Sequence, residues 1–285
     1  MILVTGSTGS NGGELLKLLS ARGVPARAMA RRTDRAGSIA ALPGIEIVAG
    51  DFDDAVSLER VLRGIERAFL LTNSTDRAEA QQMRFVAAAK RAGVRHIVKL
   101  SQLAADEASP VRFLRYHAAV ERAIRETGLD YTFLRPNLFM QGLLGFGPTI
   151  KSEGRFYAAA GDGKVSVVDV RDNAAVAAAA LTGAGHTGRT YTLTGPEALS
   201  HAGIATKLSE ALGRTIVFVD VPPEVMREVL SHTPMPAWQA DGLIEDYAHY
   251  RRGEAALVAS GVQDATSVAP RSFAAFARDF AAAFT

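Results

Sequence analysis

The sequence predicts an α/β protein with a doubly wound parallel sheet. Short apolar runs rich in β-forming residues alternate with helical stretches through the first half of the chain. Such alternation is typical of βαβ units, in which helices of about ten to fifteen residues cover both faces of a parallel sheet. The rhythm changes after Pro136, which indicates a smaller C-terminal α/β lobe that holds a substrate.

Six strands are predicted in the first half from their apolar, β-branched and aromatic residues. They lie at Ile2–Thr5, Ala26–Ala30, Ile45–Val48, Ala68–Thr72, His96–Leu100 and Tyr131–Leu134. Apolar residues at helical spacing predict the helices between them, at Glu14–Arg22, Val56–Leu62, Ala78–Ala92 and Arg112–Thr127. Because crossovers in such sheets are right-handed, we expect the ligand outside the carboxyl ends of the strands.

The second half predicts a separate lobe. We place one domain at 1–150 and a smaller, mainly helical lobe at 151–285, with strands near 165–170 and 191–194 that return to the first domain or flank it. Helices are predicted at Arg171–Leu181, Ile204–Leu212 and Phe273–Phe284. Asp172 or Asn173 is expected to cap the first of these, so we interpret the nearby charges as structural.

Composition excludes several classes of function. The chain has 285 residues, a formal charge of +2 and no basic run interleaved with aromatic residues, so we expect neither nucleic acid nor membranes as partners. The absence of cysteine excludes disulfides, thiol catalysis and cysteine-ligated metal. The six histidines lack paired metal-ligand spacing, and no metal site is expected. The short N-terminal apolar segment resembles no signal sequence, and we expect a cytoplasmic protein.

The opening MILVTGSTGSNGG carries the strongest local signal. Gly6, Gly9 and Gly12 lie between a predicted strand and a predicted helix. Glycines allow a tight turn and a close backbone approach, and the N–H groups at a helix start receive an anion such as a pyrophosphate. No Gly-Lys-Ser/Thr follows, so this is not a P-loop; the alternative is an ordinary glycine-rich turn. The predicted dinucleotide-binding residues of this turn are Gly6, Ser7, Thr8, Gly9, Ser10, Asn11 and Gly12.

Two arginines after the second strand indicate which dinucleotide is bound. An NAD-specific site would place an acidic residue there for the ribose 2′-hydroxyl, whereas Arg31 and Arg32 suit a 2′-phosphate. We therefore expect NADPH as the cofactor, with NADH as a weaker one. The alternative is a solvated basic turn.

The ends of the next two strands are expected along the same cofactor. Asp51 could accept a hydrogen bond from the adenine amino group while Phe52 stacks nearby. The alternative is that Asp51, Asp53 and Asp54 cap the next helix, as one of the last two is expected to do. The topology places three residues beside the nicotinamide ribose: Thr72, Asn73 and Ser74.

A family resemblance covers essentially the whole chain. GSTGSNGG, ARR, GDFDD, FLLT, RHIVKLS and GLDYTFLRPNLFMQ resemble, in order and spacing, the NmrA-like branch of the atypical short-chain dehydrogenase/reductases, and GKVSVVDVRDNAAVAAAAL and YTLTGPEALS continue the likeness. The resemblance implies a Rossmann-type fold that binds NADP(H); we add Pro136 and Asn137 to the cofactor-binding residues. That branch includes quinone oxidoreductases, azo-dye and triphenylmethane-dye reductases, isoflavone-reductase-like enzymes and inactive relatives that sense NADP(H).

The catalytic pattern departs from that of typical short-chain reductases, which use Tyr-x-x-x-Lys and a Ser. Ser101 and Tyr116 occupy matching places, but Val120 stands where the lysine falls, so ordinary alcohol–ketone interconversion is not expected. His117 occupies the place of a lysine in the isoflavone-reductase-like relatives, and some dye reductases resemble this chain in having histidine there. His117, Tyr116 and Ser101 are the catalytic candidates. The alternative for His117 is a half-buried structural histidine.

The missing Tyr/Lys pair favours conjugated acceptors. A quinone gives a phenolate-like product whose conjugate acid has a pKa of about 10, so a finely tuned proton donor is not needed. Reduction then requires a flat acceptor stacked about 3–3.5 Å from the nicotinamide. An apolar slot for it is predicted from residues that could equally be core: Phe139, Met140, Phe146, Phe156 and Trp238, with Tyr247 nearby.

The sequence thus predicts an NADPH-dependent reductase, a monomer or homodimer, that transfers hydride directly to a small planar quinone-like or azo-dye acceptor without flavin or metal. The alternative is a non-catalytic regulatory protein of the NmrA type that senses NADP(H). A reductase of carbon–carbon double bonds in phenolic metabolites is a third hypothesis, which the absence of lysine at position 117 disfavours.

Overall fold

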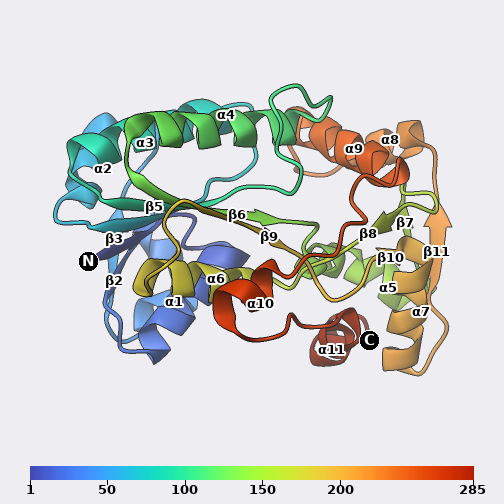
Figure 1. The fold of residues 1–285 in the computed structure, drawn as a ribbon. Helices are drawn as coiled ribbons and strands as arrows, with labels where there is room; N and C mark the ends of the chain where they lie inside the picture. Colours follow the sequence, from blue (N-terminus) through green and yellow to red (C-terminus); the bar gives the residue numbers. More distant parts are fainter. The chain divides into compact units, whose positions relative to one another are not determined.

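The computed structural model describes residues 1–285 except for the side chain of Arg35, and divides the chain into two compact units (Figure 1). Unit 1 comprises Met1–Glu107, Leu114–Arg135 and Val170–Tyr191. Unit 2 comprises Ala108–Phe113, Pro136–Asp169 and Thr192–Thr285. The single boundary expected at residue 150 is therefore wrong. Segments distant in sequence return to complete each unit, and they pack more closely with it than with their chain neighbours.

Unit 1 is built on a seven-stranded sheet in the order β3-β2-β1-β4-β5-β6-β9. Its strands are β1 (Ile2–Val4), β2 (Ala26–Ala30), β3 (Ile45–Ala49), β4 (Arg67–Leu70), β5 (His96–Leu100), β6 (Asp130–Pro136) and β9 (Arg189–Leu193). The pairings from β3 through β6 are parallel. The strand order reverses between β1 and β4, which is the switch point where a doubly wound sheet binds its ligand. The predicted fold class is confirmed.

Helices cover both faces of this sheet. They are α1 (Ser10–Ala21), α2 (Ala55–Leu62), α3 (Ala78–Arg91), α4 (Arg112–Thr127) and α6 (Val170–Thr182). α1 packs against α6, and α2 packs against α3; Figure 1 shows α2, α3 and α4 over one face and α1 and α6 over the other. An apolar cluster that includes Ile97, Phe133 and Val120 fills the space between the sheet and the first of these helical layers.

Three helix starts can be compared with the sequence. Asp54 caps α2 by accepting from the N–H groups of Val56 and Ser57, as predicted for one of the aspartates. α1 begins at Ser10, four residues before the predicted start, so Gly12 lies within its first turn. The predicted cap at Asp172 or Asn173 is wrong, because α6 already begins at Val170.

Unit 2 contains two small sheets and six helices among the residues described. β7 (Arg155–Ala158) pairs in parallel with β11 (Val217–Asp220), and β8 (Lys164–Val165) pairs antiparallel with β10 (Leu199–Ser200). The helices are α5 (Gly147–Glu153), α7 (His201–Leu212), α8 (Pro223–Ser231), α9 (Ala237–Arg251), α10 (Gly261–Thr266) and α11 (Phe273–Asp279). Short 3-10 turns lie at Met140–Phe146 and Ala281–Ala283 in this unit, and at Thr33–Arg35 and Gly37–Ala41 in unit 1.

The two strands predicted in the second half differ in outcome. The run near 191–194 joins the central sheet as β9. The run near 165–170 does not, because only its first residue belongs to β8 and Val168 makes an isolated bridge with Phe139. None of the helices that the structure describes is long and apolar enough to span a membrane.

Candidate cofactor and active site

The three glycines of the first turn differ in whether the fold itself requires a residue without a side chain at that position. Gly6 has a φ of +61°, and an added Cβ would lie 2.9 Å from the Leu71 Cγ. A Cβ on Gly12 would lie 2.3 Å from the Gly6 carbonyl oxygen, so this glycine lets α1 start against the turn. A Cβ on Gly9 would meet only the Gly6 oxygen at 3.4 Å, an ordinary contact. The protein itself therefore requires Gly6 and Gly12, whereas Gly9 leaves open space.

That open space lies at the start of α1. Gly9 is the N-cap residue, no side chain caps the helix, and its first turn contains no acidic residue. The N–H groups of a helical first turn have no intrahelical acceptor and carry the positive end of the helix dipole. The local geometry therefore fits an anion such as a pyrophosphate.

Two polar side chains of the turn are used inside unit 1. The Ser7 hydroxyl donates to the Met29 carbonyl at 2.7 Å, which ties the turn to β2. The Asn11 side-chain oxygen Oδ1 accepts from Nδ2 of Asn173 in α6 at 3.1 Å, and Asn11 is buried. These two side chains thus shape the turn, and their backbone is what remains for a ligand.

A cavity of about 340 Å³ lies at the carboxyl ends of β1 to β4. Eight predicted cofactor residues line it: Gly6, Ser7, Thr8, Arg31, Asp51, Phe52, Thr72 and Asn73. Gly9 and Ser10 instead border a second hollow of about 380 Å³ beside α1, and Asn11 and Gly12 are buried. The wall also contains residues that the sequence analysis missed, among them Met29, Arg77 and Gln81. Whether these residues reach the cavity wall depends on how the loops fold over the sheet, which cannot be predicted from a local sequence motif.

The structure separates the two arginines. The Arg32 guanidinium binds the Asp34 carboxylate, with Nε to Oδ1 at 3.1 Å and Nη2 to Oδ2 at 2.6 Å. Arg31 lines the cavity and Arg32 does not. Arg31 is therefore the better candidate to bind a 2′-phosphate.

The acidic turn after β3 also has divided roles. Asp51 accepts from the Asp53 N–H at 2.9 Å, a local turn bond that leaves the half-buried carboxylate at the cavity wall. Asp53 forms ion pairs with Arg77 and Arg84. The Phe52 ring packs against Phe85 with centroids 5.8 Å apart, so the protein fixes its orientation at the wall.

Tyr116 and His117 lie side by side on α4. Their ring centroids are 4.2 Å apart, and both side chains are buried. The Tyr116 hydroxyl is 3.1 Å from the hydroxyl of Ser74, which follows β4 at the carboxyl edge of the sheet. The structure thus connects two catalytic candidates with one of the residues predicted along the nicotinamide ribose.

The partner of His117 is a lysine that the sequence analysis did not single out. Lys99 lies on β5 with no exposed surface, and its Nζ is 2.8 Å from His117 Nδ1. Side chains alternate along a strand, so Lys99 shares a face with Ile97, which belongs to the apolar cluster under α4. A lysine in the core-facing register of a buried strand is unusual, and this was the signal that could have identified it.

Burial changes the protonation of this pair. It lowers the pKa of Lys99 to about 7, with Glu121 acting to raise it and Arg135 to lower it further. Burial, followed by the charges of Lys99 and Arg135, holds the pKa of His117 well below its usual range. His117 is therefore neutral at pH 7.

Ser101 belongs to a different network. Its hydroxyl donates to Glu121 Oε1 at 2.6 Å. Glu121 has no exposed surface and also binds Arg135 at 2.6 and 2.9 Å and Arg125 at 3.2 Å. The hydroxyl proton of Ser101 is thus committed to a buried carboxylate.

The remaining predicted site residues belong to unit 2, including Pro136, the last residue of β6. Asn137 donates to the Ser166 hydroxyl at 2.7 Å and the Ala255 carbonyl at 2.8 Å, and its own oxygen accepts from the Leu138 N–H at 2.8 Å. Its amide is therefore fully used within unit 2, which argues against the expected contact with a cofactor.

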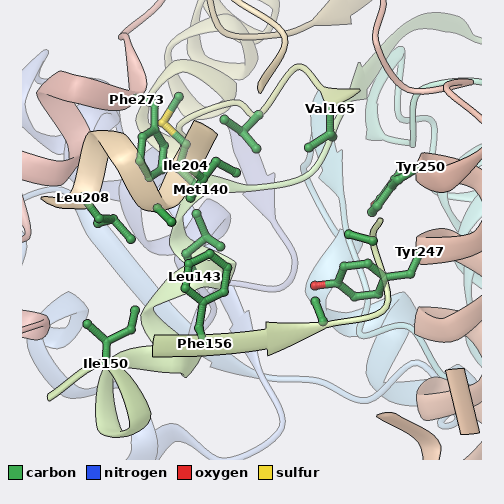
Figure 2. Packing of buried hydrophobic residues seen from close by; sticks show 14 of the residues in the cluster. Met140, Leu143, Ile150, Phe156, Val165, Ile204, Leu208, Tyr247, Tyr250 and Phe273 are labelled. Carbon is green, nitrogen blue, oxygen red and sulfur yellow. The ribbon is translucent and has the colours of Figure 1, made fainter. Parts of the chain in front are cut away.

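The predicted apolar slot also needs correction. Met140 and Phe156 are 0% exposed and pack in the core of unit 2, where Figure 2 shows them with Leu143, Ile204 and Phe273. A side chain without accessible surface cannot contact a substrate in this conformation, so these two are core residues. Tyr247 lies in the same core.

The other predicted slot residues retain some exposure. Phe139 and Phe146 are half-buried. Trp238 is half-buried as well; it packs on Phe113 with centroids 5.4 Å apart and lies under the guanidinium of Arg112 at 5.4 Å.

Comparison with known proteins identifies the family of the chain. A model of the NmrA-like family matches residues 1–272. The chain belongs to this family. It is 40% identical to the (4-alkanoyl-5-oxo-2,5-dihydrofuran-3-yl)methyl phosphate reductase of Streptomyces griseus over 100% of this chain and 99% of that protein. It is 37% identical to the NAD(P)H azoreductase of Xenophilus azovorans, again over 100% and 99%.

A solved structure of a relative has the same fold as this chain. The NADPH-dependent quinone oxidoreductase of Escherichia coli, determined with NADPH, superimposes with a TM-score of 0.88 at 27% identity, over 98% of this chain and 99% of that one. The expected family and the Rossmann-type fold are confirmed. The expectation of an NAD(P)H-dependent oxidoreductase is confirmed by the full-length relatives, which are reductases.

Proposed function

We propose that this protein is an NADPH-dependent reductase of quinone-like and other conjugated acceptors. The observation that carries the proposal is the arrangement at one edge of the sheet in unit 1. A cavity with an arginine in its wall adjoins an uncapped helix start, and a neutral histidine and a tyrosine follow beyond β4. This arrangement suits a cofactor that ends beside His117 and Tyr116.

The chain's own residues fit the cofactor. The first-turn N–H groups of α1 bind the pyrophosphate at the open side of Gly9. Arg31 binds the 2′-phosphate, and Asp51 accepts from the adenine amino group. When bound, the reduced nicotinamide supplies a hydride.

The relatives' names indicate the kind of acceptor. Quinones, azo compounds and an alkanoyl dihydrofuranone all contain a double bond conjugated with an electron-withdrawing group. An acceptor of this kind spreads the negative charge that arrives with the hydride onto an oxygen or nitrogen. The hydroxyl of Tyr116, held by Ser74, and the His117 N–H donate hydrogen bonds to that atom, and water supplies the proton. For a quinone the absent lysine at position 120 is then no obstacle, because its phenolate-like anion is weakly basic and needs only modest stabilisation.

The test is NADPH oxidation with a panel of acceptors. The purified protein is mixed with NADPH and, in turn, a naphthoquinone, an azo dye, an acylated butenolide and a saturated ketone of similar size, while NADPH absorbance is followed. We expect turnover with one or more conjugated acceptors and none with the ketone. NADPH binding without turnover of any conjugated acceptor would overturn the proposal and favour the sensing alternative.

A further inference from the structure

We propose that Lys99 is a positioning residue for His117: its ammonium group fixes the proton of the imidazole on Nε2 and polarises that N–H towards the acceptor. This inference rests on the proposed reductase function. It assigns a role to a buried lysine that neither the glycine turn nor the nucleotide cavity uses.

The geometry places Lys99 where it can act on His117 from behind. Lys99 Nζ lies 2.8 Å from His117 Nδ1 and donates to the Leu100 carbonyl at 3.2 Å. The strand neighbours at the same register are apolar, with Leu70 on β4 and Phe133 on β6. Neither strand neighbour can accept a hydrogen bond through its side chain, and His117 is the side chain that lies within hydrogen-bond distance of the ammonium group.

The direction of this hydrogen bond decides the tautomer. An ammonium group has three donors and no acceptor. While Lys99 is charged, Nδ1 of His117 must accept, and the single proton of the neutral imidazole then resides on Nε2. A neutral amine could also accept from an Nδ1–H, so the tautomer would no longer be fixed. The charge on Lys99 thus determines which ring nitrogen is the donor.

The charge has a second effect on the same bond. A cation behind an imidazole makes the opposite N–H a stronger donor, as a carboxylate would make it a weaker one. The acceptor atom gains negative charge as hydride arrives, so a stronger donor stabilises the transition state more than the ground state. Loss of the Lys99 charge should therefore lower kcat/KM with little effect on NADPH binding, because Lys99 is not among the residues of the cavity wall.

The surrounding charges set the pH range. Glu121 from α4 and Arg135 from β6 face Lys99 together with His117, and Glu121 is itself paired with Arg125. Burial dominates and lowers the pKa of Lys99 to about 7. Lys99 is charged below that pH and neutral above it, so kcat/KM should fall as the pH rises through about 7. His117 does not become charged in that range, because its pKa lies well below its usual value.

The decisive experiment combines nitrogen NMR with kinetics on the full-length protein. Wild type and Lys99→Met are labelled with ¹⁵N-histidine, and the His117 signals are assigned from their loss in His117→Gln. We expect wild-type His117 at pH 6.5 to carry its proton on Nε2. In Lys99→Met we expect a changed tautomer population and a His117 pKa closer to the ordinary value. The matched control is Lys90→Met, which removes an exposed lysine from α3 of the same unit. It should change neither the tautomer population nor the pKa of His117.

Kinetics with a quinone that the wild type reduces complete the test. Lys99→Met should lower kcat/KM about tenfold at pH 6.5, which is the effect of one pKa unit in the donor strength of the His117 N–H. The variant should also lose the fall of kcat/KM that the wild type shows as the pH rises through about 7. NADPH affinity should be unchanged. An unchanged His117 tautomer and an unchanged pH profile in Lys99→Met would overturn the inference. Where Lys99→Met does not fold, wild-type His117 with its proton on Nδ1 would overturn it equally.

The two proposals fail separately. Absence of quinone reduction by wild-type protein that binds NADPH overturns the reductase function, and with it the catalytic purpose of the pair. An active wild type whose His117 behaves identically without Lys99 overturns the positioning role alone.

Discussion

Alanine substitutions at three neighbouring glycines separate ligand binding from folding. Gly9→Ala places a methyl group in the open space at the start of α1, where its nearest neighbour is the Gly6 oxygen at 3.4 Å. Its φ of −90° and ψ of 173° are allowed for alanine. We therefore expect Gly9→Ala to fold with near-normal stability and to obstruct the pyrophosphate.

The size of each effect follows from the geometry. Losing one or two charge-assisted hydrogen bonds of about 1.5 kcal/mol each weakens NADPH binding roughly ten- to hundredfold in Gly9→Ala. In Gly12→Ala the methyl group meets the Gly6 carbonyl at 2.3 Å, and a backbone group cannot yield cheaply. Overpacking of this kind destabilises by about 1–3 kcal/mol or more. Gly13→Ala is the control, because its Cβ would lie 3.8 Å from the Ser7 oxygen, and alanine favours the helix by about 0.5–1 kcal/mol.

The assay is thermal unfolding with and without NADPH, joined to calorimetric titration. Gly12→Ala should melt several degrees lower, at about 2–4 °C per kcal/mol for a domain of this size. Gly9→Ala should melt like the wild type without ligand and lose most of the NADPH-induced rise. Wild-type NADPH affinity in Gly9→Ala would refute the placement of the pyrophosphate, and wild-type stability in Gly12→Ala would refute the packing argument.

Three further predictions follow from single contacts. Arg31→Glu should weaken NADPH binding much more than NADH binding, because Arg31 lines the cavity. Arg32→Glu should change the ratio of NADPH to NADH affinity little, because Arg32 is paired with Asp34. Calorimetric titration of each variant with both nucleotides measures these affinities. Glu121→Gln should lower the free energy of unfolding by about 3–5 kcal/mol in urea, because it leaves the half-buried Arg135 without its carboxylate. Asp54→Ala should lower it by about 1 kcal/mol through loss of the α2 cap, and an unchanged urea midpoint would refute that role.

Local patterns predicted much of unit 1. β2, β5 and α4 begin and end where the apolar periodicity places them, because a strand or helix with one buried face records that face in its own residues. α1 was predicted to start too late, since Ser10 to Gly13 carry no apolar periodicity. The turn was nevertheless identified, because Gly6 is required by its positive φ and Gly12 by close backbone contact, and both requirements are recorded in the residue type itself.

Long-range packing was not predictable in the same way. α6 belongs to unit 1 because it packs on α1, more than a hundred and forty residues earlier, and no local pattern records that partner. The same limit affects the predicted slot. Met140 and Phe156 have the residue types of a pocket wall, but those are equally the types of a core, and only the fold decides between them.

The buried side of β5 shows how the polar residues divide their tasks. α4 presents His117 and Glu121 one turn apart, opposite Lys99 on β5 and Ser101 just after the end of that strand. Glu121 accepts a hydrogen bond from the Ser101 hydroxyl and pairs with the Arg135 guanidinium, so its negative charge is compensated within this network. Lys99 is therefore only partly compensated by that carboxylate, and its cationic character is directed at the His117 imidazole. If Lys99 were instead hydrogen-bonded to Glu121, the core would still be stable, but the tautomer of His117 would not be fixed. The one-turn spacing of His117 and Glu121 on α4 places the imidazole, rather than the carboxylate, next to the ammonium group.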